Sequence, residues 1–261
     1  MTGDIAQYYS TPLKGGIHMP DENHLRCLNR DVIKYIAMFT MLLNHIAHIF
    51  LEPGTALWAV FTGAGYFTAP VMVYFMVEGY GYTRSKRKYF LRLLLFAAVS
   101  QFPYYFAFAP SGMVNLNMIA TLCLCFGIIW VTRTVENRAL RVGAVVLLVF
   151  ASVFCDWAVL APVYTLLMLW AAGDRKKTAI AYTVATALFE LFPLIGGLAG
   201  GITGPDLVRE ILMGSGVAAA GVCIVCFYNG RRMERGRTFS KWFFYCFYPA
   251  HLLLLGLLER L

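Results

Sequence analysis

The sequence predicts an all-α membrane protein, a polytopic integral membrane helical bundle with about nine transmembrane helices. Three observations predict it: 59% of the 261 residues are hydrophobic, only 14% are charged, and the mean hydropathy is +0.64. Soluble domains carry about 45–50% apolar and about 25% charged residues. A spanning helix takes roughly 20 residues, so this length accommodates about eight to ten of them. The composition also excludes an intrinsically disordered chain, which needs few apolar residues.

Apolar segments follow one another along most of the chain, after a polar N-terminal segment over residues 1–28. We expect them at 32–51, 56–80, 89–109, 113–132, 139–155, 157–173, 178–200, 207–228 and 241–258. The second segment is long, and we expect Pro70 to kink it. Only a tight connection around Asp156 separates the fifth from the sixth. Residues 29–261 are therefore expected to form a single transmembrane domain.

Loops rich in Lys and Arg alternate with loops that have one basic residue or none. The rich stretches are the N-terminal arm, 84–88, 133–141, 175–177 and 231–241. The positive-inside rule then predicts a cytoplasmic N-terminus and an external C-terminus. The net charge of +8 comes largely from these loops and is not gathered on one soluble face. We therefore expect a lipid bilayer, and no nucleic acid, around the protein.

Ionisable residues inside the first segment are the strongest functional signal, because each costs about 2.5–3.5 kcal/mol to insert. Lys34 and His45 are eleven residues apart. Three helical turns span this interval, so the two share a face about 16 Å apart along the axis. His48 follows His45 by one turn. The alternative readings are that Lys34 snorkels to the interface and that His45 only hydrogen-bonds a neighbouring helix.

Further polar residues are expected at the two ends of the same bundle. Those near the external ends are Gln101, Asn115, Asn117, Asp156, Glu190 and His251, and those near the cytoplasmic side are Glu78, Arg84, Lys86, Arg87, Lys88 and Arg92. This layout suits a large anionic cytosolic ligand whose reactive end reaches a buried base. The basic run 84–88 is equally explained as an orientation signal. No set of metal ligands is apparent, so no metal is expected.

Several short blocks carry a family resemblance in their order along the chain. They are Leu28–Phe50 with Met41-Leu-Leu-Asn44-His45, Phe67–Tyr80 with Val-Glu78-Gly79-Tyr80, Lys88–Pro103 with Ser100-Gln101-Phe-Pro103, Asn115–Thr121, and Phe244–Leu252 with Tyr248-Pro249-Ala-His251-Leu252. In this ordered set the chain resembles the TraX family, and more distantly the acyltransferase-3 group.

The resemblance implies an acetyltransferase that moves an acetyl group from cytosolic acetyl-CoA to an amine or hydroxyl acceptor at or across the bacterial cytoplasmic membrane. The implied acceptor is a pilin-like peptide or a cell-surface glycan. Lys34 stands where acyltransferase-3 proteins carry Arg, which keeps the charge and loses the bidentate fork. Asn44 stands where relatives have Asp before the His. The carboxylate that orients His45 is then open among Glu78, Asp156 and Glu190.

Acyl transfer needs a base, oxyanion donors and partners for the donor's phosphates, which gives each polar residue an expected role. The catalytic candidates are His45, as base or acyl carrier, with Asn44, His48 and His251. The candidates for binding acetyl-CoA are Lys34, Arg84, Arg87, Lys88 and Arg92. The candidates for binding the acceptor or the oxyanion are Glu78, Gln101, Asn115, Asn117 and Tyr248.

Two rival functions remain open at this point, and the sequence also allows a homo-oligomer. A non-enzymatic transporter of a small anionic solute would have a similar layout, although we find no repeat symmetry of the kind many transporters carry. A purely structural membrane subunit would leave the buried histidine and carboxylates unexplained.

Overall fold

The computed structural model describes residues 25–109, 112, 115–200 and 204–261, and this part of the chain is helical without a named strand. Its α-helices are α2 Arg30–Phe50, α3 Ala56–Gly65, α4 Thr68–Tyr82, α5 Lys86–Phe108, α6 Met118–Thr134, α7 Arg138–Ala151, α8 Leu160–Ala171, α9 Arg175–Gly200, α10 Gly204–Val222 and α11 Arg237–Leu258. A 3₁₀ turn, Ser152–Phe154, follows α7, and a π-helical turn, Cys223–Phe227, extends α10. The predicted all-α fold is confirmed. The predicted N-terminal segment 1–28 lies outside the described residues except for its last four.

The nine apolar segments correspond to these helices, with the second segment divided into α3 and α4. Pro70 is the third residue of α4, where its missing N–H costs no helical hydrogen bond. Its ring would clash with the carbonyl four residues earlier, at Tyr66. The chain accordingly leaves the helix after Gly65 and resumes it at Thr68. The expected kink therefore occurs just before Pro70.

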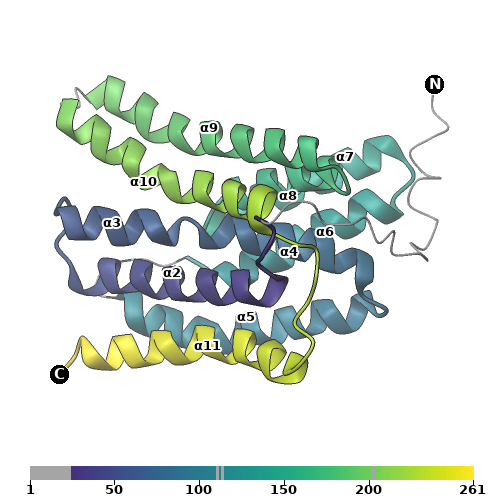
Figure 1. Ribbon diagram of the computed structural model, residues 1–261, viewed down its shortest axis with the longest axis horizontal. Coiled ribbons are helices and arrows are strands. Elements are labelled where there is room, and N and C mark those ends of the chain that lie inside the picture. The colour runs from purple at the N-terminus through teal and green to yellow at the C-terminus, as the bar shows by residue number, and fades with distance from the viewer. Residues whose placement is uncertain (1–24, 110–111, 113–114, 201–203) are drawn as a thin grey trace.

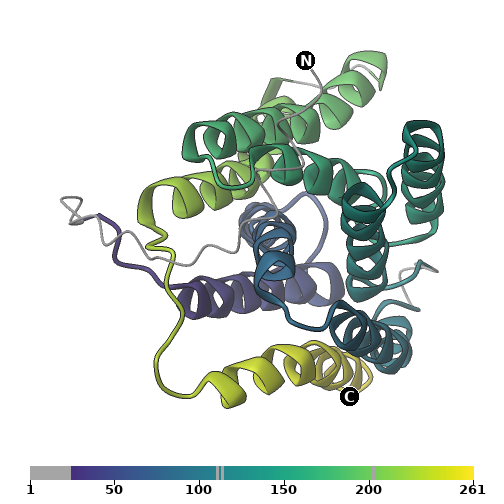
Figure 2. The ribbon, with the colours of Figure 1, turned by 90° about the vertical axis from the view of Figure 1, so that its right-hand side faces the viewer.

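The helices lie side by side as rods, with α9 and α10 at one edge of the bundle and α11 at the other (Figure 1). Viewed from the right-hand side of Figure 1, α4 lies near the centre and α7 at the periphery (Figure 2). α4 packs against α2, α6, α8 and α10. α11 returns to pack against both α2 and α5. The last helix therefore lies beside the first.

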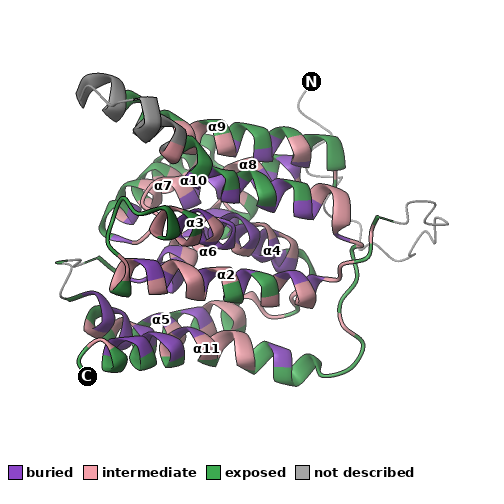
Figure 3. Cartoon of the chain, turned by 60° about the vertical axis from the view of Figure 1, so that its left-hand side comes forward, coloured by how far each residue is buried: buried purple, intermediate pink, exposed green. Residues whose placement is uncertain are grey.

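Apolar side chains cover the outside of the bundle as well as its core. Buried residues face inward and exposed ones outward in Figure 3, yet the exposed faces of α5, α7 and α11 carry Leu95, Phe102, Leu147, Phe150 and Leu254. Soluble proteins rarely expose apolar patches of this extent. Four helical stretches in the described residues are long and apolar enough to cross a membrane: Arg30–Phe50, Ala56–Tyr82, Lys86–Phe108 and Arg237–Leu258. These features are those of a membrane protein, and the side of the N-terminus stays a prediction.

A buried ion pair fixes the start of α2 against α4. Arg30 Nη1 lies 3.6 Å from Glu78 Oε2, with side chains only 8% and 20% exposed. Arg30 also donates to the Phe75 carbonyl, and the Tyr228 hydroxyl donates to Glu78. The backbone of Leu28 bonds to Phe227 and Asn229 on the segment between α10 and α11. The loop before α11 is therefore tied across the beginning of α2.

Two glycines allow α3 and α10 to touch. A Cβ built on Gly216 of α10 would lie 2.0 Å from the carbonyl oxygen of Gly63 on α3. Because the obstacle is backbone, it cannot move aside as a side chain would. Close approach of small residues is a common way to pack helices in membranes.

We expect Gly216→Ala to destabilise the protein by about 1–3 kcal/mol, the usual cost of overpacking. The matched control is Gly143→Ala on α7, where an added Cβ meets nothing within 4 Å. That change should be neutral or slightly stabilising, because Ala is the better helix former. Thermal unfolding of the two variants in detergent measures the difference. Equal melting temperatures would contradict the close packing of α3 on α10.

Candidate functional site

A cavity of about 200 Å³ opens where the imidazole of His45 lies, and we call it the histidine cavity. Its lining comprises Met41, Asn44, His45, His48, Gly65, Tyr66, Thr68, Ala69, Tyr104, Phe108, Met118, Asp156, Trp157 and Tyr248. These residues come from α2, α3, α4, α5, α6, α11 and the connections beside them. The cavity is therefore a product of the whole bundle and not of one segment.

His45 and His251 form a hydrogen-bonded pair at this cavity. His45 Nδ1 lies 2.7 Å from His251 Nε2, and the two rings are nearly coplanar, with an interplanar angle of 1°. Both side chains are buried. The two residues are separated by 206 positions in the sequence and meet because α11 packs against α2.

The second nitrogen of His251 determines which tautomer each ring adopts. His251 Nδ1 lies 2.7 Å from the Phe247 carbonyl oxygen, which can only accept, so we assign the proton to this nitrogen. In a neutral ring Nε2 of His251 is then an acceptor, and His45 Nδ1 must donate to it. His45 is left with Nε2 as its unprotonated nitrogen. This is the nitrogen that a base or nucleophile uses.

Aromatic rings enclose the pair and keep it in place. Phe108 and Tyr248 make edge contacts with the His45 ring at centroid distances of 5.4 and 6.1 Å. The buried Tyr248 hydroxyl lies close to the Met118 N–H, yet it makes no hydrogen bond of ordinary geometry to the described residues. A buried donor without a partner is costly, which makes this hydroxyl a candidate for binding a ligand.

A second cavity of about 450 Å³ adjoins the first, and we call it the basic cavity. Its charged lining residues are Arg30, Asp31, Lys34, Arg92, Arg232, Arg237 and Lys241. Asp31 accepts from the backbone N–H of Met233, and Arg30 is paired with Glu78. The remaining cations give the cavity a strong positive charge, which suits an anionic ligand.

The two cavities share part of their lining. Met41, Thr68, Ala69, Met118 and Tyr248 line both. Lys34 lines the basic cavity and His45 the histidine cavity, on the same helix and eleven residues apart. At 1.5 Å per residue they are separated by about 16 Å along α2. A single elongated space therefore leads from the basic side chains to the His45–His251 pair.

Among the predicted acetyl-CoA ligands, Lys34 and Arg92 line the basic cavity, whereas Arg84, Arg87 and Lys88 do not. The latter three are exposed around the beginning of α5. Their contact with the donor stays a prediction that the cavity does not support. Three further cations line this cavity that were not predicted as ligands from the sequence: Arg232 in the loop before α11, and Arg237 and Lys241 in the first turns of α11. In the sequence, the basic stretch 231–241 was interpreted as a signal for membrane orientation alone.

Three predicted acceptor or oxyanion residues bond to one another, away from both cavities. Asn117 donates to Gln101 Oε1 and to the Ala97 carbonyl, and its Oδ1 caps α6. Gln101 Nε2 donates to the carbonyl oxygen of Asn115, which is exposed. Glu78 is held by Arg30 and Tyr228, as described above. These contacts join helices and give no support to the predicted roles, which stay predictions, and Tyr248 is the residue of this predicted group that lines a cavity.

The remaining predicted residues differ in their relation to His45. The side chain of Asn44 donates to the Thr62 carbonyl of α3, so it joins two helices, although it also lines the histidine cavity. His48 lines the same cavity and contacts Trp58 edge-on. Their catalytic roles stay predictions. Of the three carboxylates expected near His45, Asp156 lines the cavity, whereas Glu190 packs against Gly214 of α10.

Asp156 lies in the connection before α8, largely removed from water. Burial raises the pKa of its carboxyl group to about 6, partly offset by the hydrogen bond that it accepts from the Trp157 N–H. A carboxyl group of this kind changes charge close to neutral pH. Asp156 is the carboxyl group among the residues that line the histidine cavity.

The part of the chain that contains both cavities matches a known protein family. The family model described as TraX protein matches residues 29–259. The chain is 29% identical over 243 residues to the probable fimbrial assembly protein FimC, serogroup H1, of Dichelobacter nodosus. The aligned region covers 85% of this chain and 92% of that protein. No solved structure matches the chain.

The raised pKa of Asp156 predicts a pH-dependent stability. Because the folded protein holds this proton more tightly than the unfolded chain, its stability should fall as pH rises from about 4 through about 6. Asp156→Asn should remove this component, while Asp174→Asn, at an exposed carboxylate, should keep it. Melting temperatures in detergent between pH 4.5 and 7.5 measure the difference. Parallel curves for wild type and Asp156→Asn would contradict the burial of this carboxyl group.

Proposed function

Because the chain belongs to the TraX family, we propose that it is an integral membrane acetyltransferase that uses cytosolic acetyl-CoA as donor. The observation that carries the proposal is the buried His45–His251 pair at the end of a basic cavity. A transferase of this kind needs a base beyond the reach of bulk water and a charged entrance for the CoA phosphates. The two adjoining cavities match these two needs.

The donor fits the elongated space in length. The pantetheine arm of CoA has about twelve bonds between phosphate and sulfur, as many as about four extended residues, and so reaches about 14 Å. The step from Lys34 to His45 is about 16 Å along α2. With the phosphates at Lys34, Arg92 and the cations around the start of α11, the thioester reaches the level of His45.

During the transfer, one proton moves from the acceptor to His45 and then from His45 to the sulfur of CoA. The acceptor's nitrogen or oxygen bonds to the thioester carbonyl carbon, and its proton passes to Nε2 of His45. The carbon–sulfur bond then breaks, and the sulfur leaves with that proton as the CoA thiol. Alternatively, His45 Nε2 attacks first and CoA leaves as its thiolate; the acceptor then takes the acetyl group from His45, and the acceptor's proton goes to the thiolate. The Tyr248 hydroxyl, which lacks a hydrogen-bond partner of ordinary geometry among the described residues and belongs to a residue that lines both cavities, is the candidate donor to the oxyanion that forms in either route.

His251 takes the orienting role that a carboxylate has in many histidine bases. It accepts the Nδ1 proton of His45 and so keeps Nε2 available. When His45 becomes protonated, the positive charge is shared along the bond to His251 and stabilised by the Phe247 carbonyl. A neutral partner stabilises an imidazolium less than a carboxylate does, so the base stays weaker and releases its proton readily.

The acceptor is an amine or hydroxyl presented at or across the membrane. The name of the Dichelobacter nodosus relative, a probable fimbrial assembly protein, supports a pilin-like peptide, and a cell-surface glycan is the second candidate. The alternating basic loops support a multi-pass arrangement in the bacterial cytoplasmic membrane with a cytoplasmic N-terminus. In that orientation the basic cavity opens to the cytosolic donor, and Asp156 lies on the acceptor side.

Transport of a small anion is the second candidate function, because adjoining cavities also suit a permeation path. A transporter needs no base in its path, and its flux should respond to the cavity cations more than to one imidazole nitrogen. The behaviour of His45 variants therefore separates the two functions.

We expect His45→Ala to lower kcat for acetyl transfer by about 10²–10⁴-fold, the usual contribution of a general base. His251→Ala should also lower kcat, because His45 then loses its fixed tautomer, whereas His48→Ala should have a smaller effect. Single-turnover assays and equilibrium CoA binding measure the two contributions on variants matched for melting temperature. Retained turnover in folded His45→Ala would favour transport.

We expect neutralising Arg92, Arg237 and Lys241 together to weaken CoA binding at least about tenfold, or about 1.4 kcal/mol. The matched control neutralises Arg84, Arg87 and Lys88, which are equally basic but lie outside the basic cavity. Raised salt should weaken binding to wild type and have less effect on the first triple variant. Equal losses in the two triple variants would mean that total charge, and not the cavity, attracts CoA.

A further inference from the structure

The two cavities meet at five residues that line both of them, which we call the junction: Met41, Thr68, Ala69, Met118 and Tyr248. All five are less than 10% exposed. Anything that passes from the basic cavity to His45 must pass between these side chains. The junction therefore controls which part of a donor reaches the base.

One side of the junction is rigid. The Thr68 hydroxyl donates to the Ala37 carbonyl and bonds to Thr40, so the first turn of α4 is fixed against α2. Ala69 is the next residue and has only a methyl group. Because the first turn of α4 follows directly on the break before Pro70, its position is set by that break and varies little.

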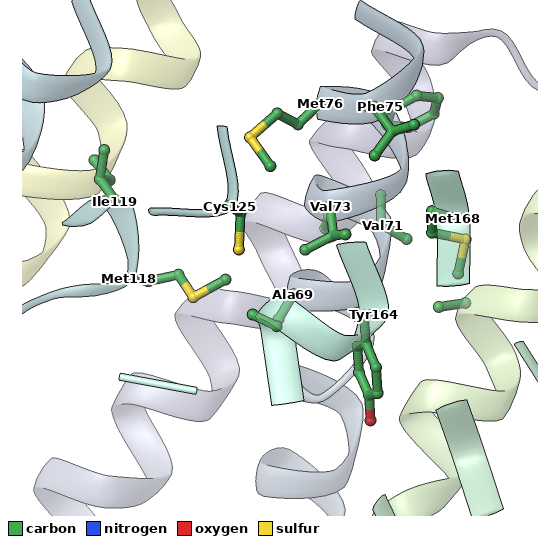
Figure 4. Packing of buried hydrophobic residues seen from close by; sticks show 14 of the residues in the cluster. Ala69, Val71, Val73, Phe75, Met76, Met118, Ile119, Cys125, Tyr164 and Met168 are labelled. Carbon is green, nitrogen blue, oxygen red and sulfur yellow. The ribbon is translucent and has the colours of Figure 1, made fainter. Parts of the chain in front are cut away.

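The other side is formed by two methionines. Met41 precedes His45 by one helical turn and so lies on the same face, toward the basic cavity. Met118 begins α6, and its side chain extends toward Ala69 of α4 in Figure 4. Unbranched methionine side chains fill irregular gaps and adjust their shape to what they contact. They leave room for a small group and close around it.

From this geometry, and resting on the proposed function, we propose that the junction selects the acyl group by length, with Met41 and Met118 as the residues that exclude chains longer than acetyl. The histidine cavity beyond them holds only about 200 Å³, less than the roughly 300 Å³ at which ligand pockets usually begin, and must also admit the acceptor. A longer acyl chain has to displace a methionine or withdraw its carbonyl carbon from His45. An apolar pocket discriminates by about 10–200-fold for one methylene.

The test compares acetyl-, propionyl-, butyryl- and hexanoyl-CoA on the purified full-length protein in detergent. The readout is the rate of CoA thiol release from each thioester as its acyl group passes to an added peptide amine or to water, together with the equilibrium affinity for CoA, which has no acyl group. In wild type, release should fall at least tenfold from acetyl to butyryl. Met118→Ala and Met41→Ala should each raise the butyryl-to-acetyl ratio at least tenfold, and a change in CoA affinity cancels from this ratio because both donors carry the same CoA.

The matched controls are Met72→Ala and Met76→Ala, which remove the same side chain from the wall of the basic cavity only. These variants should keep the wild-type ratio. Met118→Leu shortens the side chain by one atom, keeps the core filled, and should give an intermediate ratio even if the alanine variant does not fold. An unchanged ratio in folded Met118→Leu and Met41→Ala would overturn the length filter alone. Absence of thiol release from every thioester in wild type would overturn the proposed function and, with it, the filter.

Discussion

An apolar bundle offers no water to its interior, so each polar group there depends on a partner within the protein. This constraint organises the described part of the chain. Arg30 and Glu78 neutralise each other where α2 meets α4, and Tyr228 adds the loop before α11 to that contact. Asn117 uses its amide to close the start of α6. The imidazoles of His45 and His251 satisfy each other and thereby join the first helix to the last.

How well the sequence predicted each feature depends on how far apart along the chain the interacting residues lie. Helix positions depend on local hydropathy and on bilayer thickness, so all nine segments and the break before Pro70 were accessible. Helix neighbours depend on packing over long distances. His45 and His251 were each identified as candidates, yet nothing in a periodic pattern indicates that they touch. Cationic loops look alike in sequence, which is why Arg84 and Arg87 were preferred to Arg232 and Arg237. From the sequence alone, an amide such as Asn117 can be interpreted either as a ligand donor or as a helix cap.

The loop between α10 and α11 has a larger part in the site than its composition indicates. Backbone bonds from Leu28 and Arg30 hold it across the start of α2, and the side chains of Arg232 and Arg237 then stand beside the basic cavity. The same bonds position the beginning of α11, and with it the helix that carries Tyr248 and His251. The basic cavity, which is the proposed donor site, and the geometry of the histidine pair thus share one support at the start of α2.

The lengths of α7 and α8 have a consequence for the surrounding lipid. With 14 and 12 residues, these helices are only about 21 and 18 Å long, against about 30 Å for the hydrocarbon core of a typical bilayer. They pack with each other and with α6 on one flank of the protein. Such hydrophobic mismatch is relieved by local thinning of the bilayer. The turn that carries Asp156 connects the two short helices and lines the histidine cavity, so in a bilayer thinned along α7 a substrate arriving along the membrane would have less depth to cross on this side than elsewhere.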